Sequence, residues 1–223
     1  MRIAVLSDTH NLLRPEIVSY LQGCDHILHG GDISSRVILE KMEQIAQVRA
    51  VRGNNDKEWA EGLPEYLDFE LGGLHFYMTH KKKDLPEDLS SYDIVIFGHS
   101  HRYDSTWIDH TSGRRTLLLN PGSCGPRRFY QPVTMAILTI DDDGWIVKRI
   151  EILHDKKEKV PEVSGTDIRK VIEMVVSETR KGHSVEKIAR RHKVDYGLTE
   201  QIVRLYVTHP GVTVEGIMSK MGL

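Results

Sequence analysis

Side chains of the kinds that bind divalent cations follow five short apolar runs in this sequence. The runs lie at residues 3–6, 27–28, 48–51, 75–78 and 94–97. The side chains that follow them are Asp8, His10, Asp32, Asn54, His80, His99 and His101. Carboxylate, amide and imidazole ligands without thiolates suit hard or borderline cations such as manganese, iron or zinc. The pattern therefore predicts a metal site.

Two pairs of these residues are separated by a single position: Asp8 with His10, and His99 with His101. In extended chain such residues face the same side, so each pair is expected to converge. Seven ligands exceed one tetrahedral site and suit two ions that share a carboxylate. Two ions about 3.5–4 Å apart form a clamp for in-line displacement at phosphorus. A neutral Asn54 preserves the positive charge that attracts a phosphate ester and lowers the pKa of bound water.

Other chemistry-bearing residues receive a structural interpretation. His29 precedes the turn Gly30-Gly31-Asp32, so a supporting role beside the ligands stays open. Cys124 has no neighbouring His and acid to activate it and is expected to be inert. The remaining histidines are interpreted as structural: His26, His75, His110, His154, His183, His192 and His209.

The strands and helices that must position the ligands are predicted to form an α/β domain. Helical patterns at residues 14–23 and 34–46 alternate with the early apolar runs, which predicts a substantially parallel sheet. Two further strand-like runs flank Asp143-Gly144, a strong hairpin signal. Ligands bind at the carboxyl ends of strands in open α/β sheets, where the candidate ligands fall. Residues 1–155 are predicted to form this domain.

Composition is that of an ordinary globular protein. The net charge of −2 gives no general attraction to nucleic acid or to an anionic membrane. The two cysteines define no disulfide framework, and no apolar run reaches the roughly 18 residues that span a bilayer. The chain starts in a strand without a leader, so we expect a cytoplasmic protein.

Residues 156–164 are polar and lysine-rich and are predicted to be a linker, and residues 165–223 show helical patterns. Residues 184–206 resemble a helix-turn-helix, but Lys193 stands where the turn glycine is usual. Arg204 is the one basic residue on the expected exposed face of the second helix, and DNA-reading domains carry a denser positive footprint. Apolar stripes that include Ile188 and Ile202 favour helix packing or self-association.

The combined motifs Asp8-x-His10, Gly31-Asp32, Gly53-Asn54-x-Asp56, His80 and Gly98-His99-x-His101 resemble the signature of calcineurin-like metallophosphoesterases. Residues 120–128, NPGSCGPRR, resemble the NPGS…PR segment of their small YfcE-like phosphodiesterase group. The resemblance covers roughly residues 1–155. It implies a four-layer α/β/β/α sandwich with the active site on loops at one edge of the sheets.

The resemblance also implies ligand roles. One metal would be held by Asp8, His10, Asp32 and His101, and the other by Asp32, Asn54, His80 and His99, with Asp32 bridging. It implies hydrolysis of a small phosphodiester by a hydroxide that bridges two divalent metals, with Asp32, Asn54 and His99 as catalytic residues. Manganese is the first candidate metal, with iron, nickel or zinc as alternatives. A homo-oligomer stays open.

Two positions depart from the family pattern. Many relatives carry His after the ligand Asn, whereas Asn55 donates a hydrogen bond but supplies no proton, which favours esters with good leaving groups. Many relatives have Gly after His80, where this chain has the basic run 81–84. Lys81, from this run, and Arg127, from the matched NPGS…PR segment, are candidates to bind an anionic substrate beside Asn55. A solvated loop is the alternative for the lysine. Asp56 either orients the Asn54–Asn55 turn or caps the next segment.

Two rival functions remain at this point. One is a non-catalytic scaffold, as in the retromer subunit that shares this fold but has lost several ligands. The other is a nucleic-acid-directed nuclease or regulator recruited by the C-terminal helices.

Overall fold

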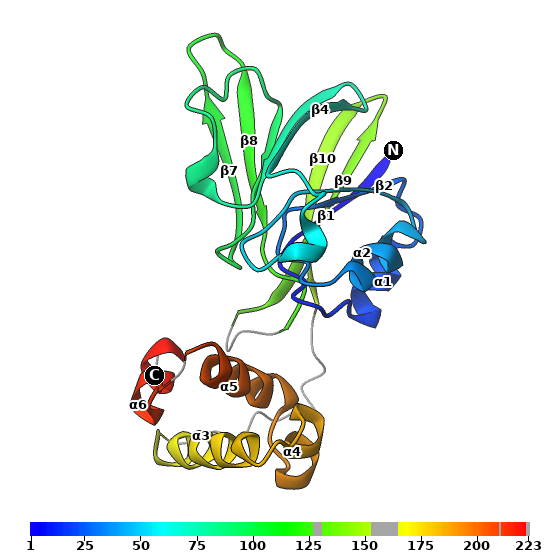
Figure 1. The fold of residues 1–223 in the computed structure, drawn as a ribbon. Helices are drawn as coiled ribbons and strands as arrows, with labels where there is room; N and C mark the ends of the chain where they lie inside the picture. Colours follow the sequence, from blue (N-terminus) through cyan, green and yellow to red (C-terminus); the bar gives the residue numbers. More distant parts are fainter. Residues whose placement is uncertain (127–130, 153–164, 210, 222–223) are drawn as a thin grey trace. The chain divides into compact units, whose positions relative to one another are not determined.

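The computed structural model describes residues 1–126, 131–152, 165–209 and 211–221 (Figure 1). The chain divides into two units, Met1–Leu153 and His154–Leu223, and each is described by itself. The predicted linker 156–164 lies outside the described residues.

The first sheet has the strand order β10-β9-β1-β2-β3. Its strands are β1 (Arg2–Leu6), β2 (His26–His29), β3 (Gln47–Ala50), β9 (Val133–Asp141) and β10 (Gly144–Ile152). β1, β2 and β3 run parallel, as the alternation of apolar runs and helices predicted. β9 runs antiparallel to β1 and forms the predicted hairpin with β10. Gly144 begins β10 with φ +127°, a value that glycine adopts without strain.

The second sheet has the order β4-β5-β6-β8-β7. Its strands are β4 (Tyr66–Leu71), β5 (Leu74–Thr79), β6 (Ile94–Ile96), β7 (Tyr103–Asp109) and β8 (Arg115–Pro121). β5, β6 and β8 are parallel, whereas the edge strands β4 and β7 are antiparallel to their neighbours. Neither edge strand was expected from the sequence, because each exposes much of its length and lacks a continuous apolar run. Both sheets are therefore mixed.

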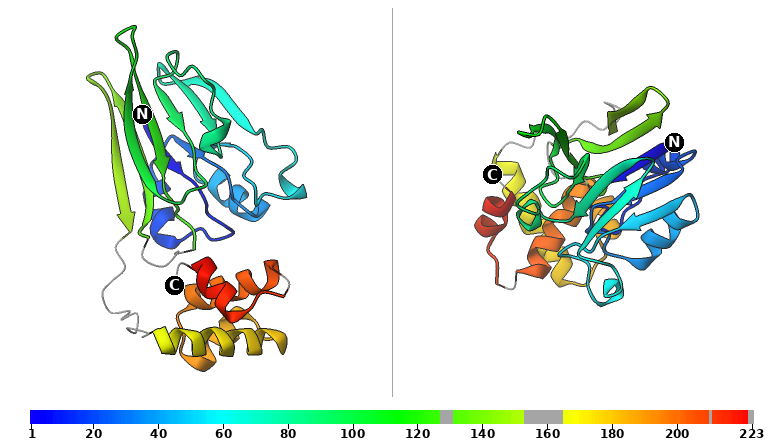
Figure 2. Two further views of the ribbon diagram at one scale, coloured as in Figure 1. Left: turned by 90° about the vertical axis from the view of Figure 1, so that its left-hand side faces the viewer. Right: turned by 90° about the horizontal axis from the view of Figure 1, so that it is seen from above.

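The two sheets pack face to face (Figure 2). The side chains buried between them include Ile3, Val5, Leu28, Phe76 and Ile96. Helices α1 (Pro15–Leu21) and α2 (Arg36–Glu43) cover the other face of the first sheet (Figure 1). The Ser35 side chain caps α2 by accepting a hydrogen bond from the amide of Val37.

The outer face of the second sheet buries Tyr77, Val95 and Phe97 under Leu85 and Leu89. These two leucines follow a short 3-10 helix, η2 (Lys82–Asp84), and a second one, η1 (Glu58–Ala60), follows β3. The expected α/β sandwich is confirmed, with its outer layers of unequal size.

The C-terminal unit contains α3 (Gly165–Arg180), α4 (Val185–His192), α5 (Tyr196–Thr208) and α6 (Val214–Met221). Its core includes Ile172, Ile188, Ile202 and Ile217, all fully buried. This confirms the all-helical extension. Within the described ranges, the longest and most apolar helices still fall short of what a membrane crossing requires.

α4 and α5 are joined by the three residues between their bounds, 193–195, which is the connection length of a helix-turn-helix. Lys193 ends α4 in the left-handed conformation with φ 53° and ψ 37°. It thus adopts the backbone shape that a turn glycine usually supplies, so its side chain does not exclude the motif. Asp195 caps α5 through the amide of Leu198.

Candidate metal centre

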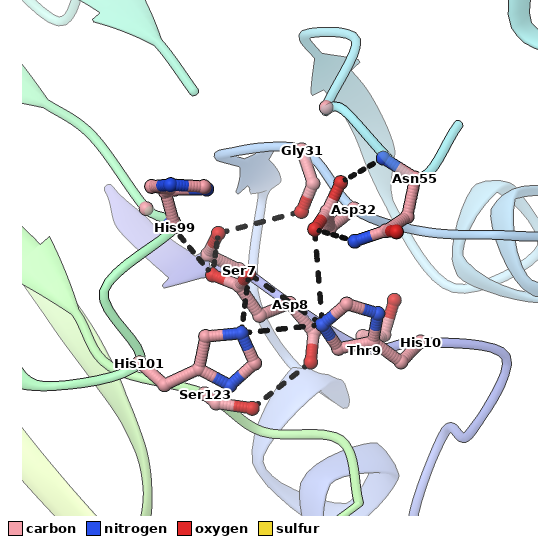
Figure 3. Close-up of polar contacts among 12 residues, drawn as sticks. Ser7, Asp8, Thr9, His10, Gly31, Asp32, Asn55, His99, His101 and Ser123 are labelled. Atoms are coloured by element: carbon pink, nitrogen blue, oxygen red, sulfur yellow. Dashed lines mark hydrogen bonds and ion pairs between the residues drawn. The ribbon is translucent and has the colours of Figure 1, made fainter. Parts of the chain in front are cut away.

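The strand ends of the two sheets meet at one place. Residues after β1, β2 and β3 approach it from the first sheet, and residues after β5 and β6 approach it from the second. Figure 3 shows Asp8, His10, Asp32, His99 and His101 around a common point. The distances between the side-chain atoms at this place show which predicted ligands could bind the same ion.

The first group of ligand atoms belongs to Asp8, His10 and His101, all buried and within 4.8 Å of one another. His101 Nε2 lies 3.0 Å from Asp8 Oδ1 and 3.2 Å from His10 Nε2. The His10 and His101 rings are stacked with their centroids 5.0 Å apart. Two imidazole nitrogens and a carboxylate oxygen therefore face one small volume.

The second group is formed by Asp8, Asp32 and His80 within the same 4.8 Å limit. His80 Nε2 lies 3.5 Å from Asp32 Oδ2 and 3.1 Å from the amide oxygen of Asn54. His10 Nε2 lies 3.8 Å from the same Asp32 oxygen. Asp8 is thus shared by both groups, and Asp32 also touches residues of both.

His99 takes part in a different way. Its amide donates a hydrogen bond to Asp8 Oδ2 over 3.1 Å, and its ring meets the ring of His80 edge-on with centroids 5.2 Å apart. The residue is exposed, unlike the buried His10, His80 and His101. Its imidazole lies at the open side of the cluster.

The ring of His80 is oriented by a backbone carbonyl. Its Nδ1 donates to the carbonyl oxygen of Gly30 over 2.7 Å, so Nε2 is the ring nitrogen that faces Asp32 and Asn54. Metal-binding histidines commonly donate their other ring hydrogen in this manner, which fixes the tautomer.

The convergence does not come from extended chain, and the sequence expectation on this point was wrong. Five candidate ligands have positive φ: Asp8 at 57°, His10 at 44°, Asp32 at 58°, His99 at 69° and His101 at 59°. Residues in this region cost about 1–3 kcal/mol each and cluster at functional sites. Successive tight bends, rather than the strand period, turn these side chains towards one another.

Close backbone approach holds these bends in place. The amides of Asp8 and His10 donate to the carbonyl oxygens of Gly31 and Asp32 over 3.0 Å each. A Cβ at Gly98 would lie 2.0 Å from Ser7 Oγ, and one at Gly53 would lie 2.1 Å from the amide nitrogen of Asp32. Only glycine permits the loops to come this close.

The donor set fits divalent cations. Asp8 Oδ1 is buried and receives no well-aligned hydrogen bond from the described residues, although His101 Nε2 lies 3.0 Å away. Buried polar atoms are otherwise almost always satisfied. An unsatisfied carboxylate oxygen that faces imidazole nitrogens is the arrangement that a cation would complete.

The electrostatics of the cluster favour ionised carboxylates. Burial opposes ionisation of Asp8, but the His101 imidazole and the Ser7 hydroxyl outweigh it, so the pKa of Asp8 is lowered. Burial likewise opposes ionisation of Asp32, yet His80 and Asn55 hold its pKa well below the usual range. Burial also lowers the pKa of His99, with help from the nearby His80.

His29 has the supporting position that the sequence left open. It is fully buried, and burial lowers its pKa to about 3, so its ring is neutral. Its Nδ1 accepts a hydrogen bond from the amide of Gly31, and its Nε2 contacts Thr9 Oγ1 over 3.1 Å. It thereby ties the loop that carries His10 to the loop that carries Asp32.

Asn55 and Asp56 both brace the second loop. Asn55 donates to Asp32 twice, from its amide to Oδ1 over 2.7 Å and from Nδ2 to Oδ2 over 2.6 Å. Asp56 accepts hydrogen bonds from the amides of Gly53 and Ser34 over 2.8 and 2.6 Å. Of the two roles that the sequence left open for Asp56, the structure shows that it orients the turn.

Sequence reasoning assigned no role to three further positioning residues. Asn120 Nδ2 donates to the carbonyl oxygen of Gly98 over 2.8 Å, and Ser123 Oγ donates to the carbonyl oxygen of Asp8 over 3.0 Å. Ser7 Oγ donates to Asp8 Oδ2 over 2.6 Å. The Asn-Pro-Gly-Ser segment was a usable signal, since it supplies two of these three residues.

The remaining predicted residues have varied positions. Lys81 is half-buried and lines a cleft beside Asn54 and His80. Arg127 lies outside the described residues. Cys124 is fully buried, and burial raises the pKa of its thiol to about 12, which agrees with an inert role.

Solved structures with the same fold include Vps29 proteins. The crystal structure of Chaetomium thermophilum Vps29 aligns with a TM-score of 0.52 at 18% identity, over 70% of this chain and 100% of that one. The Vps29 of Entamoeba histolytica complexed with Zn²⁺ aligns with a TM-score of 0.50 at 20% identity, over 68% of this chain and 99% of that one. At these identities the likeness establishes the fold alone.

Sequence relatives include archaeal proteins. A protein named phosphodiesterase MJ0936, from Methanocaldococcus jannaschii, is 29% identical over 56% of this chain and 84% of its own length. A "probable metallophosphoesterase" of Methanothermobacter thermautotrophicus is 32% identical over 64% of this chain and 88% of its own length. Residues 1–143 match the family described as the calcineurin-like phosphoesterase superfamily domain. The chain therefore belongs to the calcineurin-like phosphoesterase superfamily.

Proposed function

We propose that this protein is a binuclear, metal-dependent phosphodiesterase. The observation that carries the proposal is the meeting of two candidate ligand groups at Asp8, whose Oδ1 is buried and lacks a well-aligned hydrogen bond from the described residues. The family and the name of its Methanocaldococcus relative support phosphoester hydrolysis.

The residues suited to hold two ions fall into two neighbouring sets. Asp8, His10 and His101 surround one position, and Asp32, Asn54 and His80 surround the other, with His99 at the open side. Two divalent ions in such a clamp supply Lewis acidity and a nucleophile at neutral pH by lowering the pKa of water. Asp32 lies close to both sets and is proposed as the shared ligand.

Two side chains beside the proposed metals, His99 and Asn55, determine how a substrate would enter and which leaving groups the site would favour. The exposed His99 lies where a phosphoryl oxygen would enter, while the buried ligands keep the carboxylates away from bulk water. Asn55 is bound to Asp32 through Nδ2 and has no proton to give to a leaving oxygen. The site is therefore proposed to favour diesters whose leaving groups are good.

A non-catalytic scaffold of the same fold is the rival. This chain retains a ligand-type side chain at each of the seven candidate positions, and the structure brings Asp8, His10, Asp32, His80 and His101 within reach of one another. A scaffold has no need for these buried charges or for the left-handed bends that position them.

Hydrolysis of bis(p-nitrophenyl) phosphate by chelator-treated, manganese-loaded protein tests the proposal. Asp32→Ala is expected to reduce the rate to background, whereas Asp142→Ala, an exposed aspartate in the β9–β10 turn, is expected to keep it. Equal activity of wild type and Asp32→Ala would contradict the proposed function. A parallel count of bound metal per chain checks the binuclear part.

The proposal extends to the identity of the metal, the cellular location and the size of the substrate. Manganese is proposed first among the metals because the ligands are oxygen and imidazole groups, with iron, nickel and zinc as alternatives. A cytoplasmic location is proposed, and it is consistent with two buried, free cysteine thiols. The substrate is proposed to be a small phosphodiester.

A further inference from the structure

A cleft of about 690 Å³ opens beside the metal centre. Its size lies within the range of about 300–1,000 Å³ that is usual for small-molecule sites. Asn54 and His80 form part of its wall and are also ligands of the proposed second metal position. A diester whose phosphorus is held at the centre therefore has one ester arm next to this cleft.

One wall of the cleft is aromatic. Tyr66, at the start of β4, stacks on Tyr77 of β5 with ring centroids 5.6 Å apart and an angle of 13° between the planes. Tyr77 is buried, whereas Tyr66 is 58% exposed. An exposed ring that is held in place by a buried partner is a platform on which a flat aromatic group can stack.

Another wall carries positive charge close to the metal ligands. The half-buried Arg52 is held in place, because its amide donates to the carbonyl oxygen of Pro64 over 2.7 Å and its Nε donates to that of Asp56 over 3.3 Å. Lys81 follows His80 directly and is half-buried. These two cations suit the phosphate of a bound group.

Two carboxylates, which accept hydrogen bonds, also line the cleft. Glu65 and Asp84 are exposed and border the cleft. Carboxylates accept hydrogen bonds from N–H groups, which the edges of most nucleobases present. A flat ring with N–H donors, attached to a phosphate, matches the aromatic, acidic and basic walls together.

We propose that this cleft binds the nucleoside arm of the substrate, with its base on Tyr66 and with Arg52 and Lys81 on the side of the phosphate that the metal centre holds. The inference rests on the proposed phosphodiesterase function and names its substrate class, a nucleoside phosphodiester. A purely alkyl diester would leave the aromatic platform unused.

Binding of adenosine 5′-monophosphate and ribose 5-phosphate to the chelator-treated protein of residues 1–223 tests the proposal by calorimetry. The two probes share sugar and phosphate and differ in the base. The nucleotide is expected to bind roughly tenfold more tightly, in line with the stacking of one base. Tyr66→Ala is expected to remove the difference, and Tyr66→Phe is expected to retain it because the ring face remains.

Tyr20→Ala, an exposed tyrosine in α1, is the matched control and is expected to bind both probes as wild type does. Equal binding of the two probes to wild type, no binding of the nucleotide, or a preference that survives Tyr66→Ala would overturn the proposal. Diadenosine monophosphate and a longer oligoadenylate, used as competitors, distinguish a small diester from a polymer as the source of the nucleoside arm.

Hydrolysis of methyl p-nitrophenyl phosphate by the manganese-loaded protein separates this inference from the proposed function. If the wild type hydrolyses that diester but binds both probes alike, the nucleoside cleft is wrong and the phosphodiesterase stands. If it hydrolyses no diester yet prefers the nucleotide, the hydrolase is wrong and the cleft stands as a nucleotide-binding site.

Discussion

His80 donates its Nδ1 hydrogen to the carbonyl oxygen of Gly30 over 2.7 Å, and this bond joins the end of β5 in one sheet to the end of β2 in the other. A side chain from the second sheet is thus oriented by the backbone of the first. The candidate metal centre is built across the two sheets, so its geometry depends on how they pack.

Replacing His80 tests this dependence. His80→Ala removes a ligand nitrogen and the bond to Gly30, so binding of manganese is expected to weaken by more than about 100-fold, since loss of a mere supporting partner already costs 10–100-fold. Calorimetric titration of chelator-treated protein measures the change. His110→Ala, which contacts Thr116 in the same sheet, is expected to bind manganese as wild type does. Unchanged affinity in His80→Ala would place the metal elsewhere.

Gly98 allows the loop of His99 to pass close to β1. Gly98→Ala places a Cβ 2.0 Å from Ser7 Oγ and 2.9 Å from Asp8 Oδ2. The variant is expected to lose about 1–3 kcal/mol of stability through overpacking and to lose metal affinity, because Asp8 must move. Thermal unfolding with and without manganese measures both effects. Gly62→Ala, where nothing lies within 4 Å of the added Cβ, is the control and is expected to change neither quantity.

Lys193 holds a left-handed conformation at the end of α4. A residue with a Cβ is disfavoured there by about 1 kcal/mol, so Lys193→Gly is expected to raise the free energy of unfolding of the helical unit by roughly that amount. Lys187→Gly, within α4, is expected to lower it by about 1 kcal/mol. Amide hydrogen exchange of residues in α4 and α5 reports on this unit. If Lys193→Gly accelerated exchange, the left-handed turn would be wrong.

Glu178 links the ends of α3 and α4. Its side chain is 8% exposed and lies 2.7 Å from Lys181 Nζ, 2.8 Å from His183 Nδ1 and 3.5 Å from His192 Nε2. Lys181 and these histidines lower the pKa of Glu178 from 4.5 to about 2. A carboxyl with a depressed folded-state pKa stabilises the fold above its unfolded value and loses that contribution as the pH falls through the folded value.

The helical unit is therefore expected to lose stability between pH 4.5 and about 2. Glu178→Gln, which cannot ionise, is expected to show a flatter pH dependence across that interval than wild type. Glu186→Gln, an exposed residue of α4, is expected to follow wild type. Amide exchange of α3 and α4 along a pH series measures the difference, and parallel curves for wild type and Glu178→Gln would contradict the role of this carboxyl.

Much of the candidate site could be predicted because ligand chemistry is local. The types and order of Asp8, His10, Asp32, Asn54, His80, His99 and His101 follow directly from the sequence, as does their position after apolar runs. The parallel strands β1, β2 and β3 followed from the alternation of apolar runs with helices.

The edge strands of the second sheet, β4 and β7, were harder to predict from the sequence. β4 alternates exposed and half-buried residues, and β7 exposes most of its length, so neither displays the apolar run that marks a buried strand. Their pairing with β5 and β8 supplies the backbone partners that a local pattern does not reveal.

By itself, the sequence determined which side chains could bind cations, and it determined the helical character of the C-terminal segment, because residue type and periodicity are properties of the chain. Only the tertiary structure decided that the ends of two separate sheets face each other and that five ligands sit in left-handed bends. It also decided that Asp8 is shared by both ligand groups and that Tyr66 borders a cleft beside them. These relationships depend on long-range contacts such as His80 with Gly30 and Asn120 with Gly98, whose partners lie 50 and 22 residues apart.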